Sequence, residues 1–402
     1  MFGALARSEF RWWFGSQVLS ASGTTTQAVA VTWLVLRLDS NALFLALVTV
    51  CTMAPLIPLG PWAGTLVDHV DRRRLLMATQ SLLATFSLLL GVLVATDAVQ
   101  LWMVFAISLA TGTVSAVDSP ARQVFVRDLV GGEGVASAVS LNEVVVNASR
   151  VLGPSLGGVL LTTADITWCF VVNSLSYVGS LIVLVRTKTR SERIDRPARE
   201  PGRIWAGLRY VRGQPAILAC IVLAAAAGML FNMGVALPLL ATEVWQLGGA
   251  GFGTLMAAFG IGALPGAALA AATPWPTGRR VRILAVATGM AALLIGYAPN
   301  PAIAYAGMAA AGFASIWFIA VANTLVQLET DPAMRGRVMS VWTMALPGML
   351  PITSLLAAGV TEWLGPRAGF AASGVAVLLT VAAGWRSLGR HRRREASSTL
   401  TA

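Results

Sequence analysis

Charged and amide side chains interrupt an otherwise apolar stretch of this sequence, at the spacing of one helix face. Successive members of the set are four, three and four residues apart: Glu143, Asn147, Arg150 and Pro154. This spacing places them on one side of a helix. Burial favours the uncharged form of a carboxyl group, so Glu143 is our first candidate for a group that gains and loses a proton. Arginine does not titrate, so Arg150 would be a fixed cation for an anionic substrate group or for that carboxylate.

Two other apolar stretches carry polar stripes with helical spacing. In the first the steps are three, four and three residues: Gln17, Ser20, Thr24 and Gln27. In the second the steps are four, three and four residues: Thr111, Ser115, Asp118 and Arg122. Asp118 is the second candidate for proton exchange, with an ion pair to Arg122 or Arg127 as an equally supported alternative. For the serines and threonines, hydrogen bonds that merely join helices are an equally weighted interpretation.

The second half of the chain contributes amides but no carboxylate at a comparable depth. Its polar side chains within apolar stretches are Asn232, Asn323 and Gln327. We expect a substrate to be surrounded by polar groups from both halves: Gln17, Thr24, Gln27, Asn147, Arg150, Asn232, Asn323 and Gln327. The side chains therefore predict a binding site for a small organic molecule.

The elements that must position these groups are membrane-spanning helices. The chain is 56% hydrophobic and 12% charged, with a mean hydropathy of +0.73, whereas about 25% of a soluble domain is charged. A helix of roughly 18 apolar residues crosses a bilayer. We find twelve such runs, at about 12–36, 42–67, 75–95, 101–118, 135–161, 168–185, 216–242, 252–273, 282–298, 302–325, 338–361 and 368–385. The predicted fold is an all-α integral membrane protein with twelve transmembrane helices.

Basic residues concentrate in the predicted loops of one side of the membrane. The formal charge is +11, and all but three of the 29 lysines and arginines fall in those loops or in the termini on the same side. The exceptions are Arg37, Arg150 and Arg367. This asymmetry is the positive-inside pattern, so we expect both termini in the cytoplasm; the resemblance described below implies a bacterial inner-membrane location. The asymmetry also argues against a nucleic-acid partner.

Cysteine and histidine give little basis for metal or redox chemistry. The cysteines Cys51, Cys169 and Cys220 all lie in predicted spans, where a lone thiol is usually a packing residue. The only histidines are His69 and His391. We found no phosphate-binding glycine loop, metal cluster or pair of nucleophile and base. We therefore expect no metal, no cofactor and no enzymatic activity.

One long polar stretch divides the chain into two similar halves. We expect an N-terminal six-helix bundle at 1–186, a basic cytoplasmic linker at 187–215, a second six-helix bundle at 216–386 and a basic tail at 387–402. A basic cluster follows the second span of each half, DRRR from Asp71 and GRR from Gly278. Such internal repeats are typical of transporters with a central site, although basic loops are common in membrane proteins of any kind.

The loop GTLVDHVDRRR, which begins at Gly64, resembles the loop signature of the major facilitator superfamily, G-x-L-x-D-R-x-G-R-R. The matching residues are Gly64, Leu66, Asp68, Arg72 and Arg73; His69 and Asp71 depart from the signature. The resemblance implies that Asp68 latches the two halves on the cytoplasmic side, near residues 336–338. The departure at His69 weakens the implied charge network.

The stretch NASRVLGPSLGG, from Asn147, is similar to the fifth-helix signature of proton-coupled exporters in that superfamily, G-x-x-x-G-P-x-x-G-G. Gly153, Pro154, Gly157 and Gly158 match, and Ser149 replaces the first glycine. Proline removes a backbone hydrogen bond and glycines permit close helix contact, so this helix could bend and seal a cavity. The implied direction of transport is export.

A longer run resembles the bacterial branch of siderophore exporters and related multidrug and secretion proteins. Members of that branch often carry an acid after the Ser-x-x-Gly of the first helix, where this chain has Thr24. That departure shifts the expected proton coupling to Glu143. The resemblance implies a monomeric transporter that exchanges protons for a drug, siderophore or secondary metabolite by alternating access, with the bilayer, protons and substrate as its partners. An uncoupled facilitator and a nutrient importer of the same fold are the alternatives.

Overall fold

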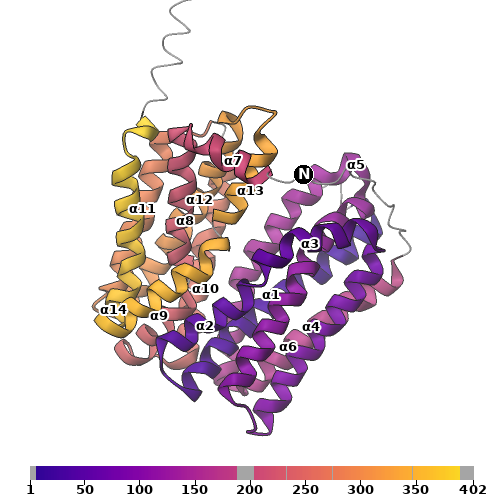
Figure 1. The fold of residues 1–402 in the computed structure, drawn as a ribbon. Coiled ribbons are helices and arrows are strands. Elements are labelled where there is room, and N and C mark those ends of the chain that lie inside the picture. The colour runs from indigo at the N-terminus through magenta and orange to yellow at the C-terminus, as the bar shows by residue number, and fades with distance from the viewer. Residues whose placement is uncertain (1–5, 188–202, 232, 274, 346, 390–402) are drawn as a thin grey trace, which may run out of the picture. The chain divides into compact units, whose positions relative to one another are not determined.

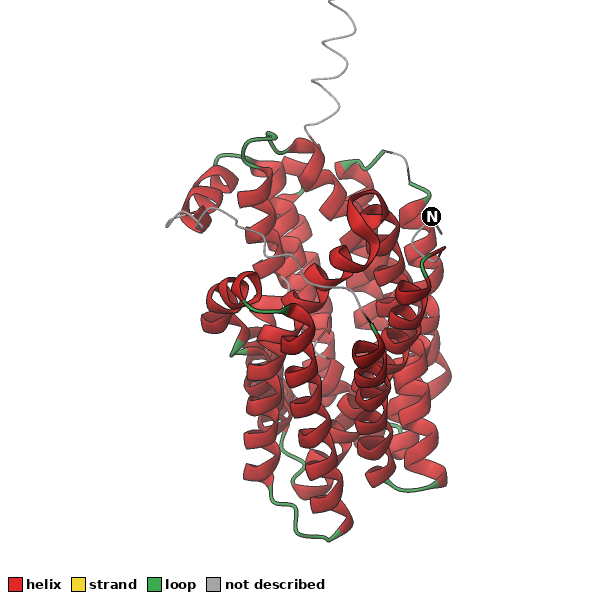
Figure 2. Cartoon of the chain, turned by 90° about the vertical axis from the view of Figure 1, so that its right-hand side faces the viewer, coloured by secondary structure: helices red, strands yellow, loops and turns green. Residues whose placement is uncertain are grey.

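The computed structural model describes residues 6–187, 203–231, 233–273, 275–345 and 347–389. Within these ranges the regular secondary structure is helical throughout (Figure 2). Nine helical segments in the described ranges are long and apolar enough to cross a membrane: Ala42–Gly60, Arg72–Ala95, Leu101–Gly131, Val144–Thr163, Ile166–Arg186, Pro215–Val244, Gly248–Ala271, Pro301–Glu329 and Leu350–Gly384. The all-α membrane fold is therefore confirmed, and the number of twelve spans stays a prediction.

The described chain forms two compact units, and the first holds Met1–Pro197 together with Gln246–Ala257. The main helices of unit 1 are α1 (Ser8–Leu38), α2 (Ala42–Met53), α3 (Leu56–His69), α4 (Arg72–Ala95), α5 (Leu101–Thr163) and α6 (Ile166–Arg186) (Figure 1). Helix α1 packs on α5 and α6, and α4 packs on α5 and α6. Trp13, Phe125 and Leu76 are buried in an apolar cluster near the α4 N-terminus. Four helices thus share one interior.

Helix α5 contains two membrane-spanning segments joined by a break at Gly131. This glycine has φ 66° and ψ 176°, a left-handed conformation that residues with a Cβ adopt at a cost. The Arg7 guanidinium donates a hydrogen bond to the Leu129 carbonyl, 3.0 Å away, next to the break. The chain therefore passes from one span to the next through a helical bend.

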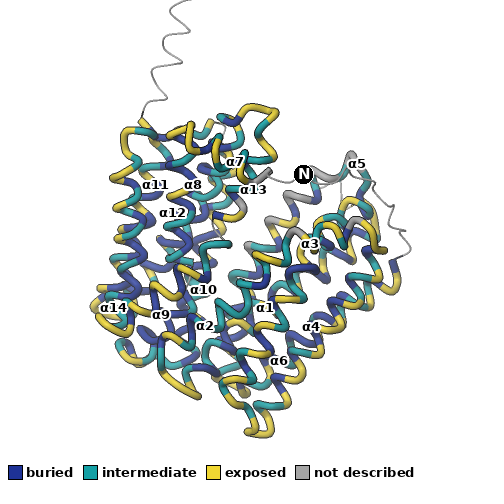
Figure 3. Tube along the Cα trace, viewed as in Figure 1, coloured by how far each residue is buried: buried dark blue, intermediate teal, exposed yellow. Residues whose placement is uncertain are grey.

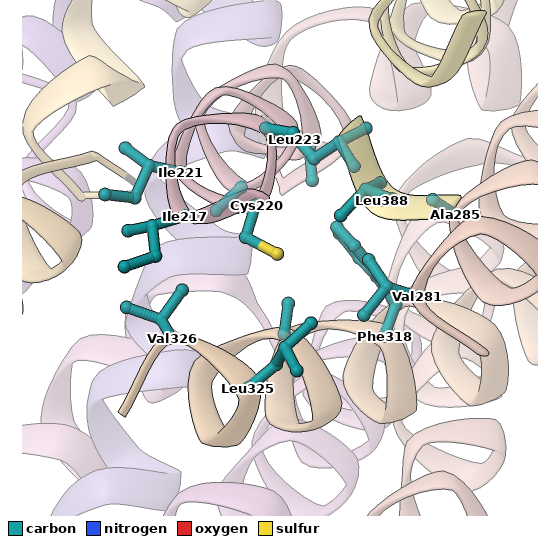
Figure 4. Packing of buried hydrophobic residues seen from close by; sticks show 14 of the residues in the cluster. Ile217, Cys220, Ile221, Leu223, Val281, Ala285, Phe318, Leu325, Val326 and Leu388 are labelled. Carbon is teal, nitrogen blue, oxygen red and sulfur yellow. The ribbon is translucent and has the colours of Figure 1, made fainter. Parts of the chain in front are cut away.

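Unit 2 holds Ala198–Trp245 and Ala258–Ala402. Its elements are α7 (Arg203–Arg212), α8 (Pro215–Phe231), α9 (Met233–Leu239), η2 (Leu240–Val244), the later part of α10 (Gly248–Ala271), α11 (Gly278–Gly296), α12 (Pro301–Glu329), α13 (Arg335–Ala345), η3 (Pro347–Met349), α14 (Leu350–Gly384) and η4 (Ser387–Gly389). Its core gathers residues from α8, α11, α12 and η4, including Cys220, Phe318 and Leu388 (Figure 4). The buried Cys220 thiol packs among hydrocarbon, as predicted.

Large apolar side chains stay exposed along the helices of both units. Figure 3 shows exposed and buried residues on the same helices; the exposed ones include Trp102, Leu175, Leu264 and Leu379. Exposed apolar surface of this extent is unfavourable in water and is stable where lipid chains cover it. The burial pattern is thus that of an integral membrane protein.

Candidate functional site

An ion pair between a buried carboxylate and a partly exposed guanidinium lies on α5 within unit 1. The Asp118 side chain is 1% exposed. Arg122, one helical turn further on, donates from Nε to its Oδ2 at 2.5 Å, and the terminal Nη2 contacts the same oxygen. This is the partner that the sequence offered as an alternative role for Asp118. A carboxylate and a guanidinium at this spacing form a charge-assisted pair, which is among the stronger hydrogen-bonded contacts in proteins.

Helix α4 supplies the other partners of Asp118. The Thr79 hydroxyl donates to Oδ1 at 2.7 Å and the Gln80 amide donates to the same oxygen at 3.0 Å. Both carboxylate oxygens therefore accept hydrogen bonds from side chains of unit 1.

Helix α1 joins the pair through Gln17. Its side-chain oxygen accepts a hydrogen bond from Nη1 of Arg122 at 3.0 Å. One guanidinium thus connects α1 to the carboxylate on α5, and through that carboxylate to α4.

A second polar cluster lies farther along α1. Gln27 accepts hydrogen bonds from the Ser87 hydroxyl of α4 at 2.5 Å and from the Asn173 amide of α6 at 2.6 Å. Between the two clusters, the Thr24 and Tyr177 hydroxyls lie 3.0 Å apart. The α1 stripe therefore faces other helices, and all three of its predicted binding residues have partners within unit 1.

Sequence reasoning missed the partners on α4 and α6. The missed residues are Thr79, Gln80, Ser87, Asn173 and Tyr177. A signal was present, because Gln80 and Ser87 are seven residues apart and Asn173, Tyr177 and Ser180 follow at steps of four and three. That is the spacing of one helix face.

The Gly-Pro break of α5 packs directly against hydroxyl groups of α1. The Thr25 hydroxyl donates to the Ser149 carbonyl and the Thr26 hydroxyl to the Gly153 carbonyl, both at 2.9 Å. A Cβ on Gly153 would collide with the Thr25 side chain. Proline lacks an N–H, so Pro154 cannot bond the carbonyl four residues earlier in α5, whereas the two threonine hydroxyls bond other carbonyls, those of Ser149 and Gly153. The glycine permits an approach that a larger residue would block.

The two later glycines of this signature also lie at close contacts within unit 1. A Cβ on Gly157 would lie 3.3 Å from Val29 of α1. One on Gly158 would lie 3.5 Å from Gly253, in the part of α10 that belongs to this unit. A side chain at Gly157 would therefore crowd Val29, whereas one at Gly158 would make ordinary contact; the tighter position is Gly253, where a Cβ would lie 2.6 Å from the Gly158 Cα.

The loop signature between α3 and α4 is bonded to its own unit. Asp71 caps α4 by accepting from the Arg74 N–H at 3.0 Å. Arg72 forms a buried ion pair with Asp128 of α5 at 3.0 Å. Arg73 donates to the Leu184 and Val185 carbonyls of α6, each at 2.6 Å. The signature arginines thus join the start of α4 to α5 and to the end of α6.

For several predicted site residues the structure does not test the predicted role in proton coupling, substrate binding or gating. The side chains of Glu143, Asn147 and Asp68 lie outside the described residues, as does Asn232 entirely. Two residues are partly buried: Gly64 in α3 and Arg150 in α5. In unit 2, the Gln327 amide of α12 donates to Asn323 at 3.2 Å. The roles of these residues stay predictions.

Comparison with known proteins adds a family match and several relatives. Residues 1–400 match the model of a family described as transmembrane secretion effector. The staphyloferrin A transporter of Staphylococcus aureus is 28% identical over 43% of this chain and 44% of its own length. The enterobactin exporter EntS of Shigella flexneri is 25% identical over 79% and 76%. The multidrug efflux pump Tap of Mycobacterium tuberculosis is 26% identical over 90% and 89%.

Solved structures share the fold at low sequence identity. A D-xylose-proton symporter superposes with a TM-score of 0.73 at 13% identity, covering 95% of this chain and 98% of its own. The nucleoside transporter NupG superposes with a TM-score of 0.75 at 11% identity, covering 96% and 99%. These neighbours establish the fold.

Proposed function

The chain belongs to the transmembrane secretion effector family of the major facilitator superfamily, and from that premise we propose that it exports a small organic molecule in exchange for protons. It is a multi-pass membrane transporter and not an enzyme. Export is supported by the names of its relatives, an enterobactin exporter and a multidrug efflux pump. The Gly-Pro-x-x-Gly-Gly sequence of α5 favours the same direction.

Proton coupling rests on the Asp118–Arg122 pair. The carboxylate is almost completely buried and accepts two hydrogen bonds from α4 besides its ion pair, and its partner Arg122 donates to Gln17 of α1. In the proposed cycle, a proton from outside binds the Asp118 carboxylate and forms the neutral acid. Arg122 then loses its counter-charge and its hold on α1. Loss of the proton to the cytoplasm restores the pair and returns α1 to its position. Glu143 is the second carrier that this cycle allows.

The substrate class follows from the groups that would face it. Amide and hydroxyl side chains with one fixed cation, Arg150, suit a molecule with several oxygen atoms and an acidic group. We therefore propose a carboxylate- or catecholate-bearing siderophore, a drug or a secondary metabolite. The binding groups would be Gln17, Thr24, Gln27, Asn147, Arg150, Asn232, Asn323 and Gln327.

The proposed architecture is that of alternating access. Twelve spans would form two six-helix bundles, with both termini in the cytoplasm of a bacterial cell and the basic linker 187–215 between the bundles. The proposed gates are the α3–α4 loop, with Asp68, and the glycine-proline segment of α5. The transporter would act as a monomer.

Proton release from inside-out membrane vesicles tests the function. Vesicles with wild type, Asp118→Asn or Glu143→Gln are energised and then given siderophore-type carboxylates or lipophilic drugs. We expect a transported compound to dissipate the proton gradient in wild type and not in Asp118→Asn, while Asp165→Asn, at an exposed helix cap, behaves as wild type. If Glu143→Gln alone abolishes the response, Glu143 is the carrier. If labelled compound crosses without any proton movement, the protein is an uncoupled facilitator.

A further inference from the structure

A groove of about 520 Å³ runs between α1 and α6, outside the polar interior of unit 1. The two helices are in contact, and Figure 1 draws them side by side. Trp12 and Leu19 of α1 and Ile182 of α6 are among the residues that line it. The volume lies in the range of roughly 300–1,000 Å³ that is usual for small-ligand sites. None of the residues proposed for transport lines this groove.

Two glycines open the groove. Gly15 of α1 and Gly179 of α6 both line it, and neither has an atom within 4 Å of the place that a Cβ would take. The neighbouring side chains are unusually exposed for their type: Trp12 is 71%, Leu19 63% and Ile182 48% exposed. The surface is therefore an open channel of hydrocarbon, and its natural occupant in a membrane is another hydrocarbon chain.

Charge is confined to one end of the groove. Glu9, in the first turn of α1, and Arg186, the last residue of α6, both line that end, and Arg186 is exposed. Arg186 is in neither the Arg72–Asp128 nor the Arg122–Asp118 ion pair. A cation and an anion at one end of an apolar channel complement an amphiphile whose headgroup carries both charges, and this favours a zwitterionic phospholipid as the occupant.

We propose that this groove binds one phospholipid from the leaflet on the Arg186 side. One acyl chain lies along Gly15 and Gly179, and the headgroup phosphate accepts hydrogen bonds from the Arg186 guanidinium. Basic groups next to membrane-spanning helices bind phosphate headgroups in this way. The lipid would join α1 to α6 on the side opposite to their polar contacts. The proposal rests on the membrane location of the chain and not on proton coupling.

Native mass spectrometry of the full-length protein in mild detergent, titrated with phosphatidylethanolamine, measures the site directly. We expect wild type to retain one lipid molecule at low lipid concentration. Gly15→Leu and Gly179→Leu should each weaken that first binding step about tenfold or more by filling the groove. Arg186→Gln should weaken it about tenfold, the factor expected for a lost charge-assisted hydrogen bond, and Arg186→Lys should restore part of the loss.

Matched variants separate this site from general lipid coating. Gly359→Leu replaces an exposed glycine with equally open surroundings on α14, and Arg212→Gln removes an exposed arginine at the end of α7. Both should bind lipid as wild type does. Equal lipid binding by all variants would overturn the proposal. The proposal would also be overturned if the wild-type protein retained no lipid, because protein rather than lipid would then cover the groove. Loss of transport with normal lipid binding would instead concern the proposed function alone.

Discussion

Arg72 at the start of α4 and Asp128 on α5 form an ion pair at 3.0 Å with side chains only 1% and 9% exposed. The pair belongs to the loop signature that connects α3 and α4, and Arg73 beside it binds the end of α6. Removing one member of a buried pair leaves the other charge without its counter-charge. The signature therefore has a structural role within unit 1, in addition to any role between the halves.

Arg72→Ala and Asp128→Ala should each lower the free energy of unfolding by about 3–5 kcal/mol, because each leaves one buried charge. Thermal unfolding of the purified protein in detergent measures the loss. The double variant Arg72→Met/Asp128→Leu should be more stable than either single variant, since no charge stays behind. Single variants as stable as wild type would show that the pair is open to water.

Gly153→Ala should destabilise the protein by about 1–3 kcal/mol, because the new methyl group collides with Thr25 and overpacks the contact between α1 and α5. Gly359→Ala is the matched control, with nothing within 4 Å of its Cβ position. Alanine favours helix over glycine by up to about 1 kcal/mol, so the control should be neutral or stabilising. Equal unfolding temperatures for the two variants would contradict the close approach at Gly153.

Gln27→Leu should cost about 1–3 kcal/mol, since the Asn173 amide loses its acceptor inside the bundle, whereas the Ser87 hydroxyl keeps the Phe170 carbonyl as an acceptor. Gln214→Leu, at an exposed glutamine before α8, is the control and should change stability by less than about 0.5 kcal/mol. Urea or thermal unfolding in detergent compares the two. If Gln27→Leu leaves the free energy of unfolding unchanged, water must take the place of the glutamine as hydrogen-bond acceptor.

Asp165 caps α6, and hydrogen bonds from the Thr167 backbone N–H and then from its hydroxyl lower the pKa of the carboxyl group. A lowered folded-state pKa gives stability that is complete above the unfolded value of about 3.9 and is lost as pH falls through the folded value. Asp165→Ala should cost about 1 kcal/mol at pH 7. The difference in free energy of unfolding between Asp165→Ala and wild type should narrow below pH 4. For Asp165→Asn, this cap should add little pH dependence to the free energy of unfolding. If the difference in free energy of unfolding between Asp165→Ala and wild type stays constant from pH 7 to pH 3, the charge of Asp165 is not the cause of that difference.

Helical spacing predicted the interior face of α1 because its polar residues are surrounded by apolar ones. Gln17 and Gln27 both contact other helices of unit 1, and Asp118 pairs with Arg122 as one alternative proposed. The all-α membrane class followed from hydropathy alone. These features are local in sequence, so periodicity can reveal them.

The partners of these residues could not be predicted in the same way. Which face of α4 meets Asp118, and which face of α6 meets Gln27, depends on how four helices pack together. The sequence predicted two spans here, and the structure has two helices separated by a kink at Gly131, whose position the sequence did not predict. A single glycine is compatible with a loop, a cap or a bend, and only tertiary contacts such as that of Arg7 decide among them.

The residues that hydrogen-bond to the α1 glutamines are synthesised long after α1 itself. Gln17 awaits Arg122, which is 105 residues later, and Gln27 awaits Asn173, which is 146 residues later. During synthesis the first helix must therefore enter the membrane with amides that have no permanent acceptor or donor, and it must be sheltered until α6 emerges. Biogenesis of this transporter thus depends on α6 as much as on α1, and we expect a chain halted before residue 173 to be degraded by the quality-control proteases of the cell.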